Sequence, residues 1–478
     1  MRGLARDLRR IVMPDAVKSD PADLYAYAAD ATYSHARRAP DAVVLPDNTR
    51  QVSEVLKYAD RRGVPVVPRG AGSGLSGGCT PLHGGIVLDM KRMRSILEIN
   101  RGNMTARAQA GVVLGNFHRA VESGGLFYPP DPQSMTVCTL GGNVATRAGG
   151  PRGVKYGTTA SYVLGCEVAL PDGTVMRTGG SCVKQSAGYD LTHLLAGSEG
   201  TLGVITEVTV RLLPLPRAHQ TALVVCESPE QAARLVSDII ASGTVPAMLE
   251  YISQMAAGAM NTIVQPPIDL SGQAYLLMDL DGTPGQVEED AKNIRDLCER
   301  AGVIETRIIS DPVESATYWR ARASLYPLIL TMAKKVIIED VTVPRHRIPE
   351  FLQTLQNITA TLGMLIGVGG HAGDGNMHPS ILFLEVNEEQ EKKARQAIIQ
   401  IIKAGLALGG TVSGEHGIGW HKAQFLEWEL GAAQVELMKR VKAAFDPHGI
   451  MNPGKLWLEK GRMQPDALPP GEKAEAAG

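Results

Sequence analysis

Two histidines beside a glycine-rich bend are the first residues of this sequence whose types and spacing could do chemistry. They are His371 and His378, in the stretch GGHAGDGNMHPS (369–380). Histidine is the commonest metal ligand in proteins and the side chain that titrates nearest neutral pH. The pair therefore indicates either a catalytic or metal-binding site, or two loop histidines that hydrogen-bond to backbone and water. The stretch by itself leaves both readings open.

A glycine-rich loop is the second candidate. PRGAGSGLSGG (68–78) follows the short apolar run VPVVP (64–68) and contains five glycines. Such a backbone can turn successive N–H groups inward and bind an anion such as a pyrophosphate. The loop also contains G-x-G-x-x-G, but the proline and glycines of CTPLHGG come next and cannot open the helix that a Rossmann dinucleotide site requires. A phosphate-binding loop outside a Rossmann fold is predicted, with a plain surface loop as the alternative.

Length and composition exclude several classes of protein. The chain has 478 residues, 44% of them hydrophobic, so two or three domains are expected. A net charge of −2, a pI near 6.6 and mixed charges throughout argue against bulk binding of nucleic acid or anionic lipid. No apolar run approaches the roughly 20 residues of a membrane span, and the first residues do not read as a secretory signal. The six cysteines form no C-x-x-C pair, which predicts buried, reduced thiols in a cytoplasmic protein.

The elements that must position the two candidate sites differ between the halves of the chain. Residues 48–63 have apolar positions at helical spacing, whereas VPVVP, IVLDM (86–90) and 105–113 read as strands. EVALPDGTVMRTG reads as a hairpin, so the first half is α+β with many short strands. Two prolines in RLLPLPRAHQ interrupt this pattern near Arg217, where a domain boundary is predicted.

Beyond this boundary helices and strands alternate regularly. Residues 221–310 give the pattern β-α-β-β-α-β, the ferredoxin-like order, with helices expected on one face of an antiparallel sheet. The alternation continues to a long helix at 389–408. The final segment, from Thr411 to Leu456, begins with another histidine-bearing glycine turn and then reads as mostly helical. The predicted parts are 1–217, 218–410, 411–456, and a polar, proline-rich, disordered tail at 457–478.

Three motifs together resemble the FAD-contacting segments of the vanillyl-alcohol-oxidase/p-cresol-methylhydroxylase (PCMH) flavoprotein superfamily. They are the loop at 68–78, PPDPQSMTVCTLGGNVATRAGGPRGVKYG (129–157) and GSEGTLGVITEVTVRL (197–212). Within the superfamily the chain is similar, over nearly all of 40–456, to glycolate oxidase of the GlcD type and to D-lactate and D-2-hydroxyglutarate dehydrogenases. The resemblance implies a PCMH-type FAD-binding domain, a ferredoxin-like α+β cap domain for the substrate, and a helical C-terminal segment that completes the active site.

The resemblance also assigns residues to FAD. The loop would hold the pyrophosphate, the second motif would line the flavin and ribityl chain, and the third would close the adenine side. Covalent members of the superfamily have a histidine where this chain has Ser73, so FAD is expected to bind non-covalently. The implied FAD-binding residues are Arg69, Gly70, Ala71, Gly72, Ser73, Gly74, Leu75, Ser76, Pro130, Thr139, Gly142, Asn143, Ala145, Gly149, Glu199, Gly203, Val204 and Ile205.

The same resemblance favours a functional role for the histidines at the bend. H-x-x-D-G-N-x-H, which begins at His371 and ends at His378, and a later E-H-G are the signature of the substrate site in the hydroxyacid dehydrogenases. By resemblance His371, His378 and Glu415 bind a divalent metal, zinc or manganese, and His416 is the catalytic base. Two imidazoles and one carboxylate leave coordination positions open, which a 2-hydroxy acid could fill.

The backbone around these residues needs special geometry. Neighbouring residues of an ordinary strand point to opposite faces, yet Glu415 and His416 must serve one small site. Gly414 and Gly417 flank them, and glycines allow a kinked or bulged backbone that aims both side chains the same way. Asp374, between two glycines, is expected mainly to bond within its turn, with support of a ligand histidine as the alternative.

An arginine is expected to bind the substrate carboxylate, because its guanidinium grips two oxygens. In TYWRARASLYP (317–327) Arg322 occupies the family's position, and Arg320 is the competitor. Relatives that use the longer 2-hydroxyglutarate have a lysine two residues before the position of Asp340, where this chain has Ile338. This departure favours a small monocarboxylate, D-lactate or glycolate, over 2-hydroxyglutarate.

The sequence does not identify the electron acceptor. It offers no NAD motif and no cysteine cluster, so reduced FAD would pass electrons to oxygen, a quinone, a cytochrome, an electron-transferring flavoprotein or an iron–sulfur subunit. A homodimer or an oxidase complex is expected, in the cytoplasm, with membrane association only through a partner. An alkyl-transferring flavoenzyme and a non-catalytic flavin subunit are the competing functions, and the two histidine motifs argue against both.

Overall fold

The computed structural model describes residues 3–32 and 38–458, which form two compact units. Unit 1 contains Met1–Ala148, Thr158–Leu215 and Glu415–Gly478, and unit 2 contains Gly149–Gly157 and Pro216–Gly414. Most of the segment predicted as a separate helical part, 411–456, therefore lies in unit 1. The tail predicted at the C-terminus lies, from residue 459 on, outside the described residues.

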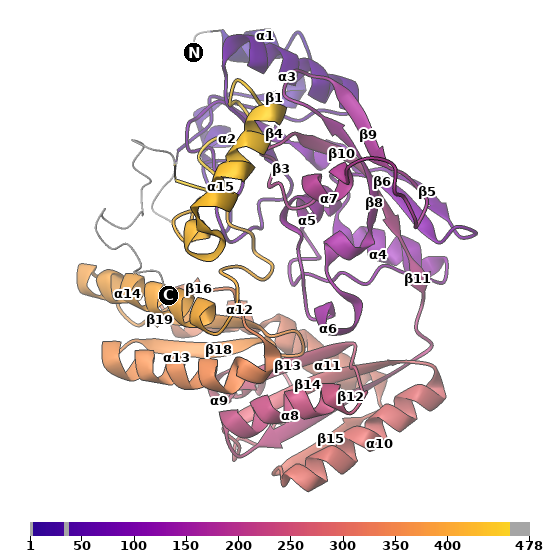
Figure 1. The fold of residues 1–478 in the computed structure, drawn as a ribbon, viewed down its shortest axis with the longest axis vertical. Helices are drawn as coiled ribbons and strands as arrows, with labels where there is room; N and C mark the ends of the chain where they lie inside the picture. The colour runs from indigo at the N-terminus through magenta and orange to yellow at the C-terminus, as the bar shows by residue number, and fades with distance from the viewer. Residues whose placement is uncertain (1–2, 33–37, 459–478) are drawn as a thin grey trace. The chain divides into compact units, whose positions relative to one another are not determined.

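The glycine loop in unit 1 follows β3 (Val66–Arg69), an edge strand of a four-stranded sheet that is parallel except for its first strand; Figure 1 labels β3 and β4 (Ile86–Asp89). The connecting helix of this sheet begins after Asn48, whose side chain accepts the Gln51 N–H, and ends at Gly63, which has φ +60°. The apolar face of this helix packs into the core of the unit, as its spacing predicted. The sheet order is β1 (Val17–Lys18), β2 (Ala42–Val44), β4 and β3, with β2, β4 and β3 parallel, and the helix is α3 (Thr49–Arg62).

A second, antiparallel sheet completes unit 1. The predicted hairpin EVALPDGTVMRTG is confirmed, and it turns at Gly173, which has φ +83°. The strand order is β5 (Ile96–Asn100), β6 (Thr105–Gln109), β10 (Val204–Arg211), β8 (Val163–Ala169) and β9 (Val175–Gly179). Two helices that follow β6 along the chain are α4 (Leu114–Ser123) and α5 (Leu140–Thr146).

The C-terminal segment is less helical than its sequence predicted. Its helical part among the described residues is α15 (Leu426–Phe445), which is broken by a kink at Gly431, where φ is +72° and ψ is +161°, and residues 411–425 form turns and bends instead. The glycine turn predicted at the start of the segment is present, because Gly417 and Gly419 take left-handed φ values of +80° and +52°, but the helix after it is shorter than expected. After α15 the chain returns to the parallel sheet, where Met451 forms a parallel bridge with Val66.

Unit 2 is built on one eight-stranded sheet whose pairings are all antiparallel. The first four strands have the spatial order β15 (Glu305–Ile309), β12 (Ala218–Cys226), β14 (Ala274–Gly282) and β13 (Met248–Ser253), which confirms the ferredoxin-like arrangement. β13 also pairs with β18 (Leu365–His371), which extends the sheet through β19 (Asn376–Phe383) to β16 (Lys335–Ile338), with β17 (Val341–Thr342) beside β19.

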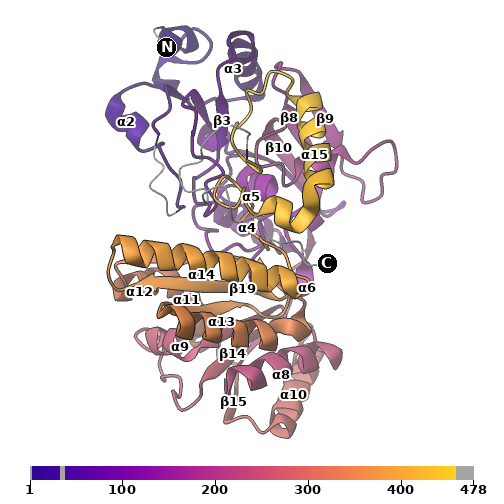
Figure 2. The same cartoon turned by 60° about the vertical axis from the view of Figure 1, so that its left-hand side comes forward.

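Helices cover both faces of this sheet, whereas the sequence predicted one. Figure 2 shows α13 (Ile348–Leu362) and α14 (Glu388–Ala407) side by side on one face. The same face carries α8 (Pro229–Ala241) and α10 (Pro284–Ala301). The opposite face packs α9 (Gln254–Met260), α11 (Pro312–Ala323) and α12 (Leu325–Met332) on a core that includes Leu223, Ile252 and Tyr275. Both faces are buried, so the strands read as continuous apolar runs and not as alternating ones.

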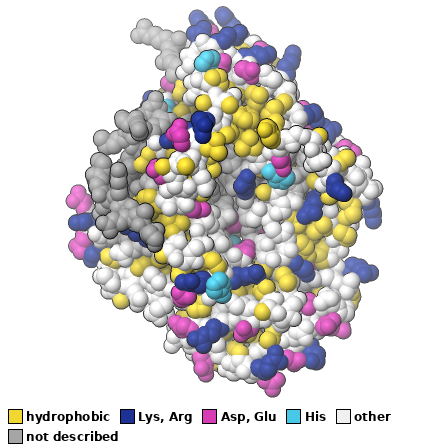
Figure 3. Space-filling view, in the orientation of Figure 1, with side chains coloured by type: hydrophobic (Ala, Val, Ile, Leu, Met, Phe, Trp, Pro, Cys, Tyr) yellow, Lys and Arg dark blue, Asp and Glu magenta, His cyan; other side chains and the backbone are white. Residues whose placement is uncertain are grey.

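The remaining elements are short. No helix within 3–32 and 38–458 is long and apolar enough to cross a membrane. Figure 3 shows acidic and basic side chains interspersed on the face it draws, in line with the small net charge. All six cysteines are free, but Cys182 is exposed, contrary to the prediction of buried thiols. The remaining bounds are α1 (Leu4–Leu8), η1 (Pro14–Ala16), α2 (Pro21–Tyr25), η2 (Met90–Arg92), β7 (Leu126–Phe127), α6 (Gly153–Tyr156), η3 (Thr159–Tyr162), α7 (Leu191–Leu195), β11 (Leu213–Pro214) and η4 (Arg345–Arg347).

Candidate functional site

The glycine loop begins at the carboxyl end of β3 and is tightly packed. A Cβ at Gly70 would lie 2.3 Å from Oγ1 of Thr139, and a Cβ at Gly72, which has φ +73°, would lie 2.1 Å from Nη2 of Arg69. Arg69 itself is buried, donates to the carbonyl of Ala29 and stacks on the ring of Tyr27. Only glycine fits at 70 and 72, so the first half of the loop is a defined structure and not a plain surface loop.

The second half of the loop packs on the C-terminal segment within unit 1. The single hydroxyl proton of Ser76 is shared between the carbonyls of Gly417, at 2.8 Å, and His416, at 3.1 Å. The carbonyl of Ser76 accepts the N–H of Trp420, and a Cβ at Gly77 would lie 2.0 Å from Nε1 of that tryptophan. The loop and the turn that carries the E-H-G motif are therefore held together. Ala71, Ser73, Gly74 and Leu75 lie between these two packed regions.

The second FAD motif places its residues around the start of α5. Thr139 caps this helix by accepting the N–H of Gly142. Asn143 is 5% exposed, and its Nδ2 has no hydrogen-bond partner among the described residues, as expected of a donor that serves a bound group. Pro130 is buried and Ala145 half-buried in the same unit. Gly149, by contrast, falls in the short stretch that belongs to unit 2.

The third motif gives a structural role to Glu199 that the sequence did not indicate. Its backbone is left-handed, with φ +50°, and its buried carboxylate accepts the N–H groups of Ile418, at 2.8 Å, and Gly419, at 2.7 Å. Burial raises the pKa of this carboxyl group, and the two N–H donors oppose the rise. Two strand residues, Val204 and Ile205, are buried at the start of β10. At Gly203 a Cβ would lie 2.8 Å from Cγ1 of Val168.

A buried lysine also lies close to the glycine loop, and sequence reasoning missed it. Lys455 is 3% exposed and donates to the carbonyl of Thr80 at 2.7 Å. Burial lowers its pKa to about 8, and burial raises the pKa of the nearby Cys79 thiol to about 12. The only signal in the sequence is a lysine after the turn residues Pro453 and Gly454, which does not distinguish it from a surface lysine.

The two histidines of the opening motif lie on neighbouring strands of a hairpin in unit 2. His371 ends β18 and His378 lies on β19, with their ring centroids 5.1 Å apart. The side chain of Asp374 accepts the N–H of Asn376, which confirms its predicted role within the turn. Gly375 has φ +87°, and a Cβ there would lie 2.0 Å from the carbonyl of Val343, so the turn needs glycine. The hairpin brings the two imidazoles together without help from another part of the chain.

A buried carboxylate connects His371 to the predicted arginine. Glu250, on β13, has no exposed side-chain surface, and its Oε1 lies 2.6 Å from Nδ1 of His371. Its other oxygen forms an ion pair with Arg322, which lies on α11 and is 8% exposed. Burial raises the pKa of Glu250, but Arg322, His371 and His378 outweigh burial and hold that pKa below its usual value. Glu250 was missed because a single acid in the apolar strand AMLEYIS carries no motif.

The competing arginine has a different environment. Arg320 is exposed and donates to Thr317 on its own helix. Arg322, in contrast, is buried and contacts Glu250, which in turn contacts His371. A guanidinium in this position can supply the carboxylate grip that the sequence predicted, because its Nε is buried and has no hydrogen-bond partner among the described residues.

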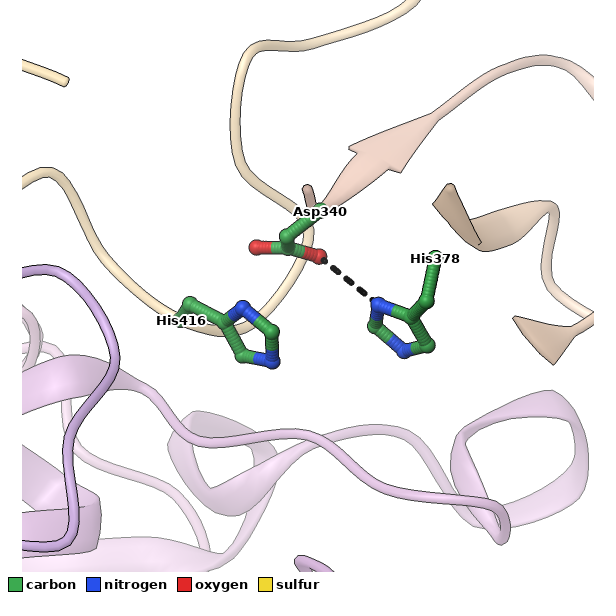
Figure 4. A group of neighbouring side chains, drawn as sticks. All are labelled: Asp340, His378 and His416. Carbon is green, nitrogen blue, oxygen red and sulfur yellow. Dashed lines mark ion pairs between the residues drawn. The ribbon is translucent and has the colours of Figure 1, made fainter. Parts of the chain in front are cut away.

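A second buried acid contacts the other histidine. Asp340 lies 4.0 Å from Nδ1 of His378, the pair that Figure 4 joins by a dashed line. Asp340 also accepts the amide of Asn376, at 2.7 Å, and the hydroxyl of Ser413, at 2.7 Å. These bonds fix the Asp340 carboxylate from two sides. The sequence indicated Asp340 only as a reference point for the absent lysine at Ile338.

The E-H-G motif belongs to unit 1 and shows how two neighbours can face one direction. Nε2 of His416 and Oε1 of Glu415 lie 3.8 Å apart, and both side chains are largely buried. The segment is not a strand, and Gly417 has φ +80°. The kink that the sequence predicted from the flanking glycines is therefore present at Gly417.

Family models match most of this chain. A model described as "FAD binding domain" matches residues 40–179, and one described as "FAD linked oxidases, C-terminal domain" matches residues 215–456. Glycolate oxidase subunit GlcD of Bacillus subtilis is 40% identical over 97% of this chain and 98% of its own. D-lactate dehydrogenase of Anaerostipes hadrus is 34% identical over 94% of each chain.

Solved structures with the same fold are more distant in sequence. p-Cresol methylhydroxylase superposes with a TM-score of 0.80 at 18% identity, over 96% of this chain and 97% of its own. Alkyldihydroxyacetonephosphate synthase gives a TM-score of 0.74 at 20% identity, over 95% of this chain and 84% of its own. At such identities the likeness shows the fold, and it confirms the α+β, PCMH-type architecture that the three motifs predicted.

Proposed function

Because this chain belongs to the FAD-linked oxidases and is an FAD-dependent oxidoreductase acting on a hydroxy acid, we propose that its substrate is a small D-2-hydroxy acid. D-lactate and glycolate are the candidates, and the product is the corresponding 2-oxo acid. The observation that supports this proposal is the buried series Arg322–Glu250–His371 in unit 2, in which one carboxylate contacts both a guanidinium and an imidazole. A guanidinium suits a substrate carboxylate, and an imidazole suits a metal.

The FAD-binding part of unit 1 fits the cofactor. The closely packed glycines at 70 and 72 have no side chain that would keep a pyrophosphate from the backbone, and Nδ2 of Asn143 is a buried donor with no partner among the described residues. We assign the pyrophosphate to the loop from Arg69 to Ser76 and the flavin to the second motif. When bound, FAD supplies a hydride acceptor at its N5 atom. Ser73 stands where covalent members have histidine, so we propose a non-covalent cofactor.

The donor set also fits a divalent metal, zinc or manganese. Nδ1 of His371 is engaged by Glu250, and this carboxylate–imidazole arrangement is common behind histidines whose other ring nitrogen binds a metal. His378 lies on the neighbouring strand, and we propose Glu415 as the third ligand. A metal in this position would stabilise the alkoxide that develops from the substrate hydroxyl.

The chain's own residues would then have distinct tasks. Arg322 binds the substrate carboxylate and so fixes which hydrogen on the α-carbon faces the flavin. His416 accepts the hydroxyl proton, and a base of this kind typically contributes on the order of 10² to 10⁴ in rate. Ile338, where relatives for the longer diacid have lysine, provides no cation for a second carboxylate, which favours lactate or glycolate over 2-hydroxyglutarate.

The electrons must leave through a partner. The GlcD relative is named as a subunit, which supports a complex with an electron acceptor for this chain too. A quinone, a cytochrome, an electron-transferring flavoprotein and an iron–sulfur subunit are the acceptor classes we propose.

Anaerobic titration of the purified yellow protein tests the proposal. We expect D-lactate or glycolate to bleach the flavin band, 2-hydroxyglutarate to bleach it more slowly, and prior chelation to remove the response. His416→Ala should retain FAD and slow the bleaching on the order of 10²-fold or more. Failure of all three acids to reduce the flavin would refute the substrate class, and full activity after verified metal removal would refute the metal.

A further inference from the structure

The turn that carries His416 is bonded on both edges by side chains of the flavin-binding motifs. Ser76, in the glycine loop, donates to the carbonyls of His416 and Gly417. Glu199, in the third motif, accepts the N–H groups of Ile418 and Gly419. The one hydroxyl proton of Ser76, shared between two carbonyls, and the two N–H bonds to Glu199 all lie within unit 1, with lengths of 2.7 to 3.1 Å, and they hold four successive backbone groups from residue 416 to 419.

Burial and backbone strain show that this arrangement is specified. Ser76 is 3% exposed and Glu199 is 8% exposed, so neither can exchange its bonds for water without opening the unit. Glu199 also holds a left-handed φ of +50°, which costs a non-glycine residue on the order of 1 kcal/mol. The two N–H groups donate to different oxygens of Glu199, Oε1 and Oε2, and a carboxylate accepts well at both, whereas the side-chain amide of glutamine accepts at one.

We propose that Glu199 and Ser76 are positioning residues that aim the imidazole of His416. The direction of a side chain follows from the φ and ψ of its own residue, and the carbonyl of His416 is one of the four bonded groups. The flavin-binding motifs therefore set the geometry of the base as well as holding the cofactor. This inference rests on the proposed role of His416, and it replaces the assignment of the Glu199 carboxylate to adenine.

A double-mutant cycle separates positioning from general structural support. Glu199→Gln keeps the shape but presents an amide N–H₂ to one of the two backbone donors. We expect it to retain FAD and to slow anaerobic flavin reduction about 10- to 100-fold, part of what the base contributes. In a His416→Ala background the same change should have less than about a 3-fold effect, because its target is already absent. An equal loss in both backgrounds, or loss of FAD from Glu199→Gln, would overturn the proposal.

Hydrogen exchange of the holoprotein tests the same bonds without any turnover. Glu199→Gln and Ser76→Ala should each increase deuterium uptake in a peptide covering residues 415–421. Glu207→Gln, which removes an ion pair with Arg107 in the same unit, and Ser53→Ala, which removes a buried hydroxyl bond to the Gly173 carbonyl, serve as matched controls. Neither control should change uptake in that peptide.

The two readouts fail independently. If no hydroxy acid reduces the wild-type flavin but hydrogen exchange rises in both variants, the proposed substrate class is wrong. The conclusion that Ser76 and Glu199 hold the turn at residues 416–419 is then still supported. Unchanged exchange in Glu199→Gln, with FAD retained, would overturn the positioning role whatever the substrate is.

Discussion

Replacing Glu250 by glutamine is the most direct test of the buried series in unit 2. The carboxylate has no exposed surface and is shared between Arg322 and His371. Glu250→Gln keeps the volume of the side chain and one carbonyl oxygen, but it removes the negative charge. The Arg322 guanidinium, 8% exposed, then stays buried without its counter-ion.

The size of the effect follows from that uncompensated charge. Removing one partner of a buried ion pair costs about 3–5 kcal/mol, and the retained amide oxygen places the cost near the lower end. For a unit of 150–250 residues each kcal/mol lowers the melting temperature by about 2–4 °C, so a fall of about 6–12 °C is expected. The lost carboxylate behind His371 should also weaken metal binding about 10- to 100-fold.

Calorimetry and metal analysis measure the two effects. Glu350→Gln is the control, because it removes an ion pair with Arg347 in the same unit. The Glu350 side chain is 56% exposed, and an ion pair of this kind contributes at most about 1 kcal/mol to stability. A melting temperature for Glu250→Gln within about 2 °C of this control would refute the energetic reasoning. An unchanged metal content after competition with a chelator would refute the support of His371.

Three further predictions concern unit 1. Gly72→Ala should lose FAD, because the added Cβ would lie 2.1 Å from Nη2 of Arg69 and the residue has a φ of +73°. Gly180→Ala, where the added Cβ meets nothing within 4 Å, should keep FAD. The ratio of flavin to protein absorbance measures both outcomes. Acid precipitation of the wild type should leave the pellet colourless, since Ser73 offers no covalent link, and a yellow pellet would contradict this. The pKa of Lys455 is lowered to about 8 by burial, so the unfolded chain binds this proton more tightly between pH 8 and 10.5, and stability rises with pH in that window. Denaturant titration of the flavin-free protein measures this effect. From pH 8 to 10.5 the free energy of unfolding of the wild type should rise by on the order of 3 kcal/mol relative to that of Lys455→Met. If the two free energies instead change in parallel with pH, the shifted pKa of Lys455 is contradicted.

Most helices, strands and turns of this chain could be predicted from its sequence. The helical spacing of Val52, Val55 and Leu56, and the alternation after residue 220, predicted elements that the structure contains, because burying an apolar face fixes the period of each element. The glycine loop and the histidine bend were visible for the same reason, since both depend on short stretches of backbone. The prediction failed in the extent of the C-terminal helix, which spans only Leu426–Phe445 and is broken at Gly431, where φ is +72°.

Tertiary structure alone decided which distant residues share a site. Glu250 and Arg322 meet His371 because β13 pairs with β18 and α11 packs on the same sheet, and no local pattern records such pairings. Glu199 and Ser76 reach the turn after His416 across more than 200 residues of chain. Sequence specifies periodicity and turn chemistry, which act over a few residues. Buried charges acquire partners only when strands far apart in the chain are brought into register.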